Sequence, residues 1–331
     1  MSSPHSRRML LATLGALPGL GFQRTGRAQP ATLPTRIVGA FDTLFAGPHE
    51  GRRAVHGNGL LVSGGFTPAP DAANWWRAPH LRGGEVPVLV RFSCFAAVPG
   101  LPENDPAASP RGMAVRFLLP DAEADIVAHS FNGFPAATPE EFLGFLGALA
   151  SGPAGLEAFA TAHPAARNFL DTPKPAPVSY ATEEFFGVSA LRFIGADGVR
   201  RAGRYRLVPA AGKAHLDAAA AALEAPDFLS RELPPRMARG EADFRLLLQL
   251  AGPGDRTDDG TRPWPEDRPL VELGRLRLRD MVPDGEARQR QLLFTPLNLV
   301  DGIEPGDDPM LLARTRAYRV SAERRLAPEA R

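Results

Sequence analysis

The chain has 331 residues, of which 44% are hydrophobic and 23% are charged, so it can bury a sizeable core as an ordinary globular protein. Its formal net charge is +1 and the charges are spread along the sequence, which argues against nucleic acid or an anionic membrane surface as a partner. Its single cysteine, Cys94, excludes an intramolecular disulfide and a cysteine-based zinc or iron–sulfur site.

Residues 1–30 have the three-part composition of an export signal. Arg7 and Arg8 precede an apolar stretch, and small residues follow near Ala28. The apolar stretch is shorter than the roughly 20 residues that a membrane-spanning helix needs, so we expect no membrane insertion. We therefore expect a signal peptide at 1–30, one domain at 31–331, and a periplasmic or secreted location.

The paired arginines, followed by Met-Leu-Leu, resemble a twin-arginine signal. Such signals export proteins that have already folded, often around a cofactor. The alternative is an ordinary signal in which two arginines are adjacent by chance. In either case the mature domain has no disulfide, so core packing and a bound cofactor are the expected sources of its stability.

Five segments are predicted to be β-strands because they are rich in β-branched or aromatic residues and lie between turn residues. They span residues 84–95, 112–119, 204–209, 242–251 and 270–280.

Three helices are also predicted. Thr138-Pro139-Glu140-Glu141 begins one of them, with threonine as N-cap, proline at the first helical position and glutamate placed for a capping box. The other two cover 217–223 and 310–325. Since strands dominate the first half and the middle, we predict an α+β fold with a mainly antiparallel sheet or barrel. The sequence alone does not show that the sheet closes.

The last predicted helix carries the residues with the most informative chemistry. At about 100° per residue, Arg314, Tyr318, Ser321 and Arg325 share one face. A neighbouring arginine stabilises a tyrosine phenolate, and a phenolate is a hard anionic ligand for ferric iron. The pattern Arg-x-x-x-Tyr is short and common, however, and by itself it also suits a surface helix with a half-buried tyrosine.

The run from Pro296 through Tyr318 resembles the proximal segment of haem catalases. The resemblance implies that Tyr318 ligates the iron of haem b, that Arg314 bonds the phenolate, and that Arg325 pairs with a propionate. It also implies an antiparallel β-barrel of catalase type with inserted and C-terminal helices. Because only thirteen residues follow Tyr318, we expect the C-terminal helical region of full-size catalases to be lacking, and the haem to be more open.

Three earlier segments, 53–59, 88–93 and 109–117, resemble the distal half of a catalase. The resemblance implies that His56 is the acid/base group and that Arg53 and Arg91 hold propionates. Arg91 and Ser93 are two residues apart, so they share one face of a strand. Arg53 and His56 are three apart, so they can serve one haem only if the strand begins or bulges between them.

The segment 125–142 resembles the stretch that supplies a distal asparagine and aromatic residues over the haem. Phe134 and Phe142 match two of the aromatic positions, but His129 occupies the asparagine position. Three outcomes stay open: His129 donates a hydrogen bond in place of asparagine, Asn132 reaches in, or peroxide is held less well. We expect the change to weaken dismutation more than activation, because dismutation needs a second peroxide placed over the oxidised haem.

The resemblance implies a short, catalase-related peroxidase that reduces hydrogen peroxide, and organic hydroperoxides, with small organic reductants. Weak catalase activity and a monomer or small homo-oligomer are expected. One alternative is a hydroperoxide-rearranging haem enzyme of the allene oxide synthase type. Others are a non-enzymatic periplasmic haem-binding protein and a barrel without haem.

Overall fold

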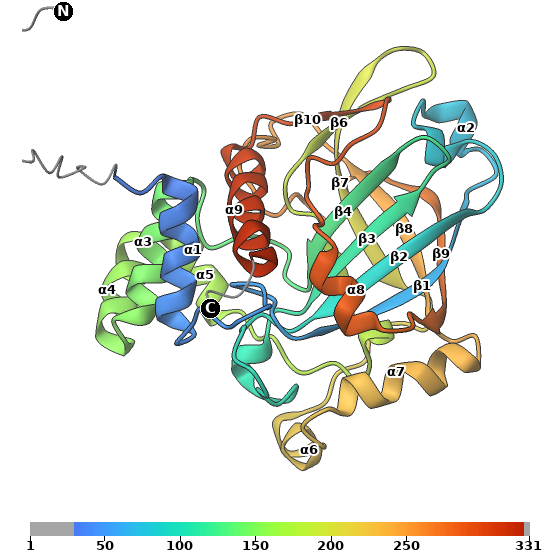
Figure 1. Ribbon diagram of the computed structural model, residues 1–331. Helices are drawn as coiled ribbons and strands as arrows, with labels where there is room; N and C mark the ends of the chain where they lie inside the picture. The colour runs from blue at the N-terminus through green and yellow to red at the C-terminus, as the bar shows by residue number, and fades with distance from the viewer. Residues whose placement is uncertain (1–29, 328–331) are drawn as a thin grey trace, which may run out of the picture. The chain divides into compact units, whose positions relative to one another are not determined.

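Eight antiparallel strands close into a barrel in the computed structural model, which describes residues 30–327 (Figure 1). Neighbouring strands follow the order β7-β5-β4-β3-β2-β1-β9-β8, and β8 pairs back onto β7. Two short strands, β6 and β10, extend the sheet beyond β7. The strands are β1 (Gly59–Pro68), β2 (Val86–Ser93), β3 (Gly112–Leu118), β4 (Glu123–His129), β5 (Phe185–Phe186), β6 (Leu191–Ile194), β7 (Arg200–Pro209), β8 (Asp243–Leu250), β9 (Leu270–Met281) and β10 (Ile303–Pro305).

The alternation of residues along the strands separates a packed interior from a functional exterior. In β2, Val88, Val90 and Phe92 belong to the core inside the barrel. The residues between them, which include Arg91 and Ser93, therefore face outward. Large side chains such as Tyr180 and Phe244 fill the interior together with these apolar residues. The barrel is thus a core that supports a site on its outer face.

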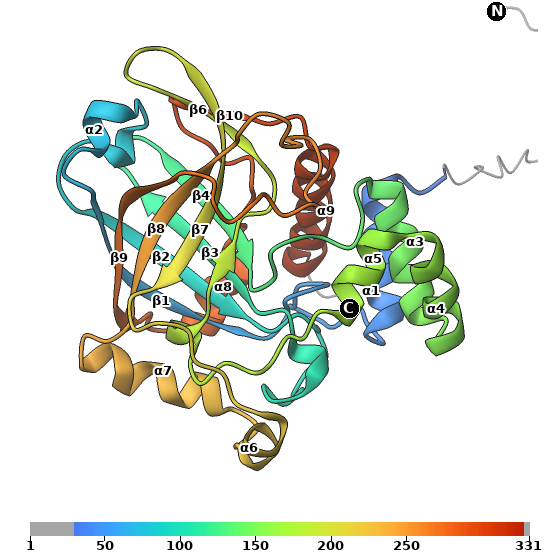
Figure 2. The ribbon, with the colours of Figure 1, turned by 180° about the vertical axis from the view of Figure 1, so that it is seen from behind.

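The helix α9 stands between the barrel and a group formed by α1, α3, α4 and α5, as the views from both sides show (Figure 1, Figure 2). A second apolar cluster joins these helices and includes Ile37, Phe41, Phe142, Phe145 and Met310. The helices are α1 (Leu33–Leu44), α2 (Ala72–Trp75), α3 (Pro139–Ala150), α4 (Pro153–Ala162), α5 (Pro164–Asp171), α6 (Ala218–Leu223), α7 (Phe228–Ala238), α8 (Gly285–Gln291) and α9 (Pro309–Leu326).

The predicted fold class is confirmed, and the five predicted strands correspond to β2, β3, β7, β8 and β9. Thr138 caps α3, and its hydroxyl accepts a hydrogen bond from the Glu141 N–H at 3.2 Å. The Glu141 carboxylate bonds the N–H of Ala137, one residue before the cap, so the expected capping box is displaced by one position. The predicted signal peptide lies outside the described residues. No described helix has both the length and the apolar character needed to cross a membrane.

A buried histidine inside the barrel makes stability depend on pH. His80 is 1% exposed and stacks on Phe117 with ring centroids 4.5 Å apart. Neither ring nitrogen has a hydrogen-bond partner among the described residues. Burial lowers the pKa of His80 to about 4, so the folded protein disfavours the protonated ring.

We predict that the free energy of unfolding falls as the pH decreases from about 6.5, where the unfolded histidine begins to bind a proton, to about 4. His80 contributes a slope of up to ~1.4 kcal/mol per pH unit in this range. Urea denaturation of wild type and His80→Phe at pH 8 and pH 5 measures it. Wild type should lose more free energy of unfolding than His80→Phe between pH 8 and pH 5, and equal losses would contradict the prediction.

Candidate active site

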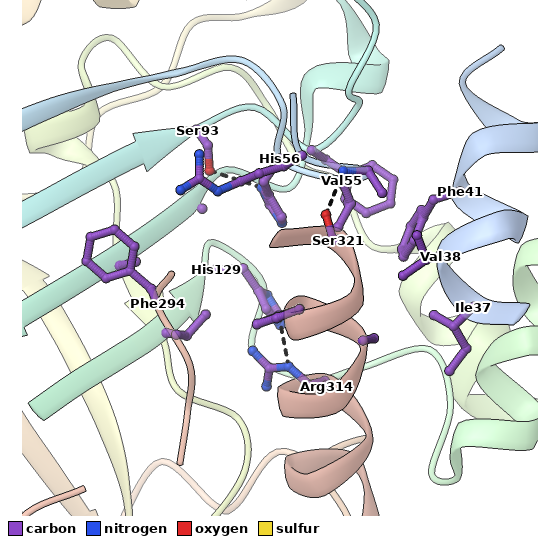
Figure 3. A pocket seen from close by; sticks show the side chains of 18 of the residues that line it. Ile37, Val38, Phe41, Val55, His56, Ser93, His129, Phe294, Arg314 and Ser321 are labelled. Atoms are coloured by element: carbon purple, nitrogen blue, oxygen red, sulfur yellow. Dashed lines mark hydrogen bonds between the residues drawn. The ribbon is translucent and has the colours of Figure 1, made fainter. Parts of the chain in front are cut away.

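A cavity between the outer face of β2–β4, α9 and α1 brings together nearly all the site residues predicted from the sequence (Figure 3). Asn132 is the exception. It follows β4 in an irregular turn and does not line the cavity. The predicted residues in the cavity wall are Arg53, His56, Arg91, Ser93, His129, Phe134, Phe142, Arg314, Tyr318 and Arg325.

The helix α9 supplies one side of the cavity. It begins after Asp308, whose carboxylate accepts a hydrogen bond from the Met310 N–H at 2.8 Å, and Pro309 occupies its first position. The predicted shared face is confirmed, since Arg314, Tyr318 and Arg325 all line the cavity. The Arg314 Nε donates to the Tyr318 hydroxyl at 3.2 Å, so a charged donor stabilises negative charge on that oxygen.

His56 faces the cavity from the barrel side. Since β1 begins only at Gly59, Arg53 and His56 both lie in the preceding loop, and strand alternation does not separate them. His56 has a φ of 55°, in the left-handed region, which costs a non-glycine residue about 1–2 kcal/mol. The His56 N–H donates to the Phe95 carbonyl at 2.8 Å, and the His56 carbonyl accepts from Arg91 Nη2 at 2.9 Å. These bonds hold the strained backbone in place.

A hydrogen bond fixes the orientation of the His56 ring. Its Nδ1 lies 3.1 Å from the Ser93 hydroxyl, which leaves Nε2 available to a ligand. Burial, together with the positive charges of Arg91, Arg314 and Arg53, lowers the pKa of His56 to about 3. The imidazole is therefore neutral at ordinary pH and can accept a proton.

Three arginines at one end of the cavity have no carboxylate partner in the described part of the chain. Arg53 donates to the carbonyls of Gln289 and Leu292 at 2.7 and 2.8 Å. Arg325 shares the Leu292 carbonyl at 3.0 Å. Arg91 Nε donates to the Gln289 side-chain oxygen at 2.7 Å.

The charges of these arginines are therefore incompletely compensated. Burial lowers the pKa of Arg91 and of Arg325 to about 10. Burial, with the charges of Arg91 and Arg325, lowers the pKa of Arg53 well below its ordinary value. Guanidinium groups in such surroundings suit the anionic groups of a ligand.

His129 ends β4 and lines the same cavity as His56. It is 9% exposed, and neither of its ring nitrogens has a partner among the described residues. Burial and the charge of Arg314 lower the pKa of His129 to about 3, so this ring is also neutral. It therefore offers a ligand one donor and one acceptor.

One wall of the cavity was not predicted from the sequence. Ile37, Val38 and Phe41 on α1 face it (Figure 3). Phe41 packs edge-on against Phe142 of α3 at 6.0 Å. The spacing of Ile37, Val38 and Phe41 is that of an amphipathic helix, so the sequence did contain a signal for this element.

The arrangement suits a large ligand that is mostly apolar and anionic at one edge. Two aromatic side chains, Phe134 and Phe142, lie 5.0 Å apart by ring centroids and extend the apolar wall. Among the described residues, no group of three His, Cys, Asp or Glu side chains could hold a bare metal ion. A metal ion that is held mainly by a prosthetic group would need only one ligand from the protein, and the phenolic oxygen of Tyr318 is a suitable ligand.

Comparisons with known proteins show which family the chain resembles. The family model described as Catalase matches residues 45–331. A catalase-related peroxidase of Mycolicibacterium paratuberculosis is 38% identical over 286 residues, covering 84% of this chain and 90% of the relative. A catalase-related peroxidase of Synechococcus elongatus is 30% identical over 330 residues, covering 96% of each chain.

Solved structures show the same fold. The chain superposes on catalase A from Saccharomyces cerevisiae with a TM-score of 0.76 and 21% identity, covering 84% of this chain and 62% of the yeast protein. A fungal catalase gives a TM-score of 0.76 at 23% identity, with 92% of this chain and 66% of that one covered. The chain thus spans less than two thirds of the length of these two catalases.

We predict that Gly112→Ala disturbs the His56 ring, because Gly112 lies directly beneath it. An added Cβ would lie 2.6 Å from the Ser93 hydroxyl oxygen and 2.9 Å from His56 Nδ1. The side chains or the backbone must shift to avoid this overlap, and the shift should lower the free energy of unfolding by about 1–3 kcal/mol. Gly84→Ala is the control, because no atom lies within 4 Å of its Cβ position. Urea denaturation compares the variants, and equal stabilities would contradict the prediction.

Proposed function

This chain belongs to the catalase family, and we propose that it is a haem b-dependent peroxidase. In this proposal it reduces hydrogen peroxide and organic hydroperoxides with small organic electron donors, and dismutates hydrogen peroxide only weakly. The observation that carries the proposal is a single cavity with Tyr318 and Arg314 on one side, His56 and Ser93 on another, and three arginines without carboxylate partners among the described residues. The names of the two related peroxidases support the same reaction class.

The residues of the cavity fit a haem. The buried Arg91 and Arg325 and the half-buried Arg53 have only neutral acceptors in the described structure, so two propionates would supply the missing negative charge. The apolar walls suit a porphyrin face, and Tyr318 offers one hard oxygen ligand. A bound haem would supply a ferric centre at which a peroxide can be reduced by two electrons.

Tyr318 would hold the iron through its phenolic oxygen. Arg314 donates to that oxygen at 3.2 Å and so stabilises its anionic form. Because both residues lie one turn apart on α9, the helix fixes their relative position. Arg53, Arg91 and Arg325 would fix the other end of the group through its propionates.

His56 would move the proton that peroxide reduction requires. If Nδ1 carries the hydrogen and donates to Ser93, Nε2 is free to accept a proton from the inner oxygen of the peroxide. The same nitrogen can deliver that proton to the outer oxygen, which then leaves as water or an alcohol. The lowered pKa of His56 keeps the ring neutral, as the first transfer demands.

His129 would hydrogen-bond the peroxide in place of an asparagine. Its unpartnered nitrogens are free for this role. An imidazole is bulkier than a carboxamide, and it carries a single donor. We propose that it holds a second peroxide less well, so that donor oxidation exceeds dismutation.

We also propose that the protein is exported as a folded unit, by a twin-arginine signal within residues 1–30, and that it acts in the periplasm or outside the cell as a monomer or small homo-oligomer. The support is the composition of that segment, with Arg7 and Arg8 before an apolar stretch and small residues near Ala28.

The proximal assignment predicts the behaviour of Tyr318→Phe. Loss of the only proposed protein ligand should abolish haem binding or shift the Soret band of the purified protein. Tyr205→Phe is the matched control, since Tyr205 is buried in the barrel core. Absorption spectra of both variants test the assignment. An unchanged haem spectrum in Tyr318→Phe would mean that this tyrosine does not hold the iron.

The distal assignment predicts that His56→Gln keeps the haem spectrum but loses about 10²–10⁴-fold in the rate of peroxide-dependent dye oxidation. His163→Gln, on a residue outside the cavity wall, should retain the wild-type rate. In wild type, rates after rapid pH jumps should stay level from pH 8 to pH 5 and fall as the pH approaches 3, where His56 becomes protonated. A full wild-type rate in His56→Gln would refute the assignment.

Product analysis separates the alternatives. A fatty-acid hydroperoxide supplied without a donor should be left largely unconverted by a peroxidase, whereas a rearranging enzyme would consume it fully. A haem carrier would show the Soret band with no turnover of either peroxide or dye.

A further inference from the structure

A second cavity adjoins the first on the side of the three arginines. It lies between α1, the loop 45–54 and the end of α9, and its volume is about 500 Å³. Five residues line both cavities: Phe41, Arg53, Ala54, Ser321 and Arg325. The wall between them is held by the Ala54 N–H, which donates to the Ser321 hydroxyl at 3.2 Å (Figure 3).

Arginine side chains outnumber carboxylates around this second cavity. Among the described residues, its wall contains the arginines Arg52, Arg53, Arg290, Arg324 and Arg325 and the acidic residues Asp42 and Glu50. Arg324 and Asp42 form an ion pair at 2.7 Å and so largely cancel each other. His49 Nε2 lies 2.9 Å from the Phe45 carbonyl. In the holoprotein Arg53 and Arg325 would be paired with the propionates, so the remaining positive charge of the wall would come from Arg52 and Arg290, against Glu50.

Arg290 occupies a distinctive place in this wall. Its guanidinium packs against Gly51, where an added Cβ would lie 2.6 Å from Cζ. Its charge also contributes, after burial, to the lowered pKa of Arg325. Arg290 is exposed and has no carboxylate partner within the described residues. An anion in the cavity would relieve the repulsion between these two arginines.

Part of the lining of the second cavity is apolar and aromatic. Phe41 and Phe45 stack with ring centroids 6.0 Å apart and an interplanar angle of 16°. Pro48 and Ala97 extend this surface. A flat organic molecule could contact these side chains while its charged group meets the arginines.

We propose that the second cavity binds a small aromatic anion, such as a phenol bearing a carboxylate, as the electron donor. The inference rests on the proposed peroxidase function and adds the donor class and its location. Because Phe41, Arg53 and Arg325 line both cavities, a bound donor would lie against the edge of the first cavity where the propionates would lie.

The reaction balances with two donor molecules for each peroxide: ROOH + 2 ArOH gives ROH + H₂O + 2 ArO•. The peroxide O–O bond breaks, and the two oxygens together gain two electrons and two protons. Each phenol loses one electron and its hydroxyl proton. Its carboxylate is unchanged and serves only for binding.

Titration calorimetry with 4-hydroxybenzoate tests binding directly on the purified holoprotein, without peroxide. We expect one site, weaker binding as salt screens the arginines, and much weaker binding of neutral 4-hydroxybenzyl alcohol. Arg290→Ala should weaken 4-hydroxybenzoate binding about fivefold, and Arg290→Glu should weaken it more. Arg288→Ala is the matched control on the same helix, since Arg288 lines neither cavity.

Kinetics provide the second readout. Arg290→Ala should raise KM for 4-hydroxybenzoate about fivefold while kcat changes less than about twofold, and Arg288→Ala should behave as wild type. Equal binding of the acid and the alcohol, or Arg290 variants that bind like wild type, would overturn the inference. Binding that follows these expectations in a protein without any peroxide-dependent turnover would overturn the donor role and the proposed function, but not the anion site.

Discussion

The gathering of three guanidinium groups, two of them buried, around a shared set of neutral oxygens is the constraint on which the site depends. Arg53, Arg91 and Arg325 converge on the segment that contains Gln289 and Leu292. Carbonyl and amide oxygens satisfy some of their hydrogen-bond donors but do not compensate their charge. Such an arrangement is costly by itself and becomes favourable when an anionic ligand enters. It therefore ties the stability of this part of the fold to what it binds.

The fold remains stable despite that cost because the residues of its core and the residues of its site lie on opposite faces of the barrel sheet. Inside the barrel, apolar and aromatic side chains such as Phe92, Tyr180 and Phe244 form a core without a ligand. On the outer face of β2 and β4, Arg91, Ser93 and His129 face the cavity. One strand, β2, thus contributes to both, and the two-residue period of a strand keeps the two roles from interfering.

The sequence predicted elements whose periodicity or capping was strong. The β-branched run of β2 and the Thr138-Pro139 start of α3 are local signals, and the structure has both. The conformation of His56 could not be predicted, because its positive φ is set by bonds to Phe95 and Arg91, which are distant in sequence. The helix α7 was also not predicted, because it contains Pro234 and Pro235. The burial of Leu229 and Leu233 supports it.

Asn132 illustrates a different limit. Asn132 is three residues after His129, a spacing that places two side chains on one side of a helix. The chain leaves β4 in an irregular turn instead, so the two side chains do not share a direction. The shared direction of Tyr318 and Arg314 was predictable, because the helix that carries both residues is continuous from Pro309 to Leu326.

The pairing of β8 with β7 has a consequence for how copies of the chain meet. A barrel of eight strands leaves little free backbone edge. In the described sheet, the three-residue strand β10, which ends in Pro305, stands at an end, and β4 pairs with β5 only through His129 and Phe186. Unpaired edges are the usual template for strand addition and aggregation between molecules. The closed pairing therefore leaves little backbone through which one copy of the chain could extend its sheet into another.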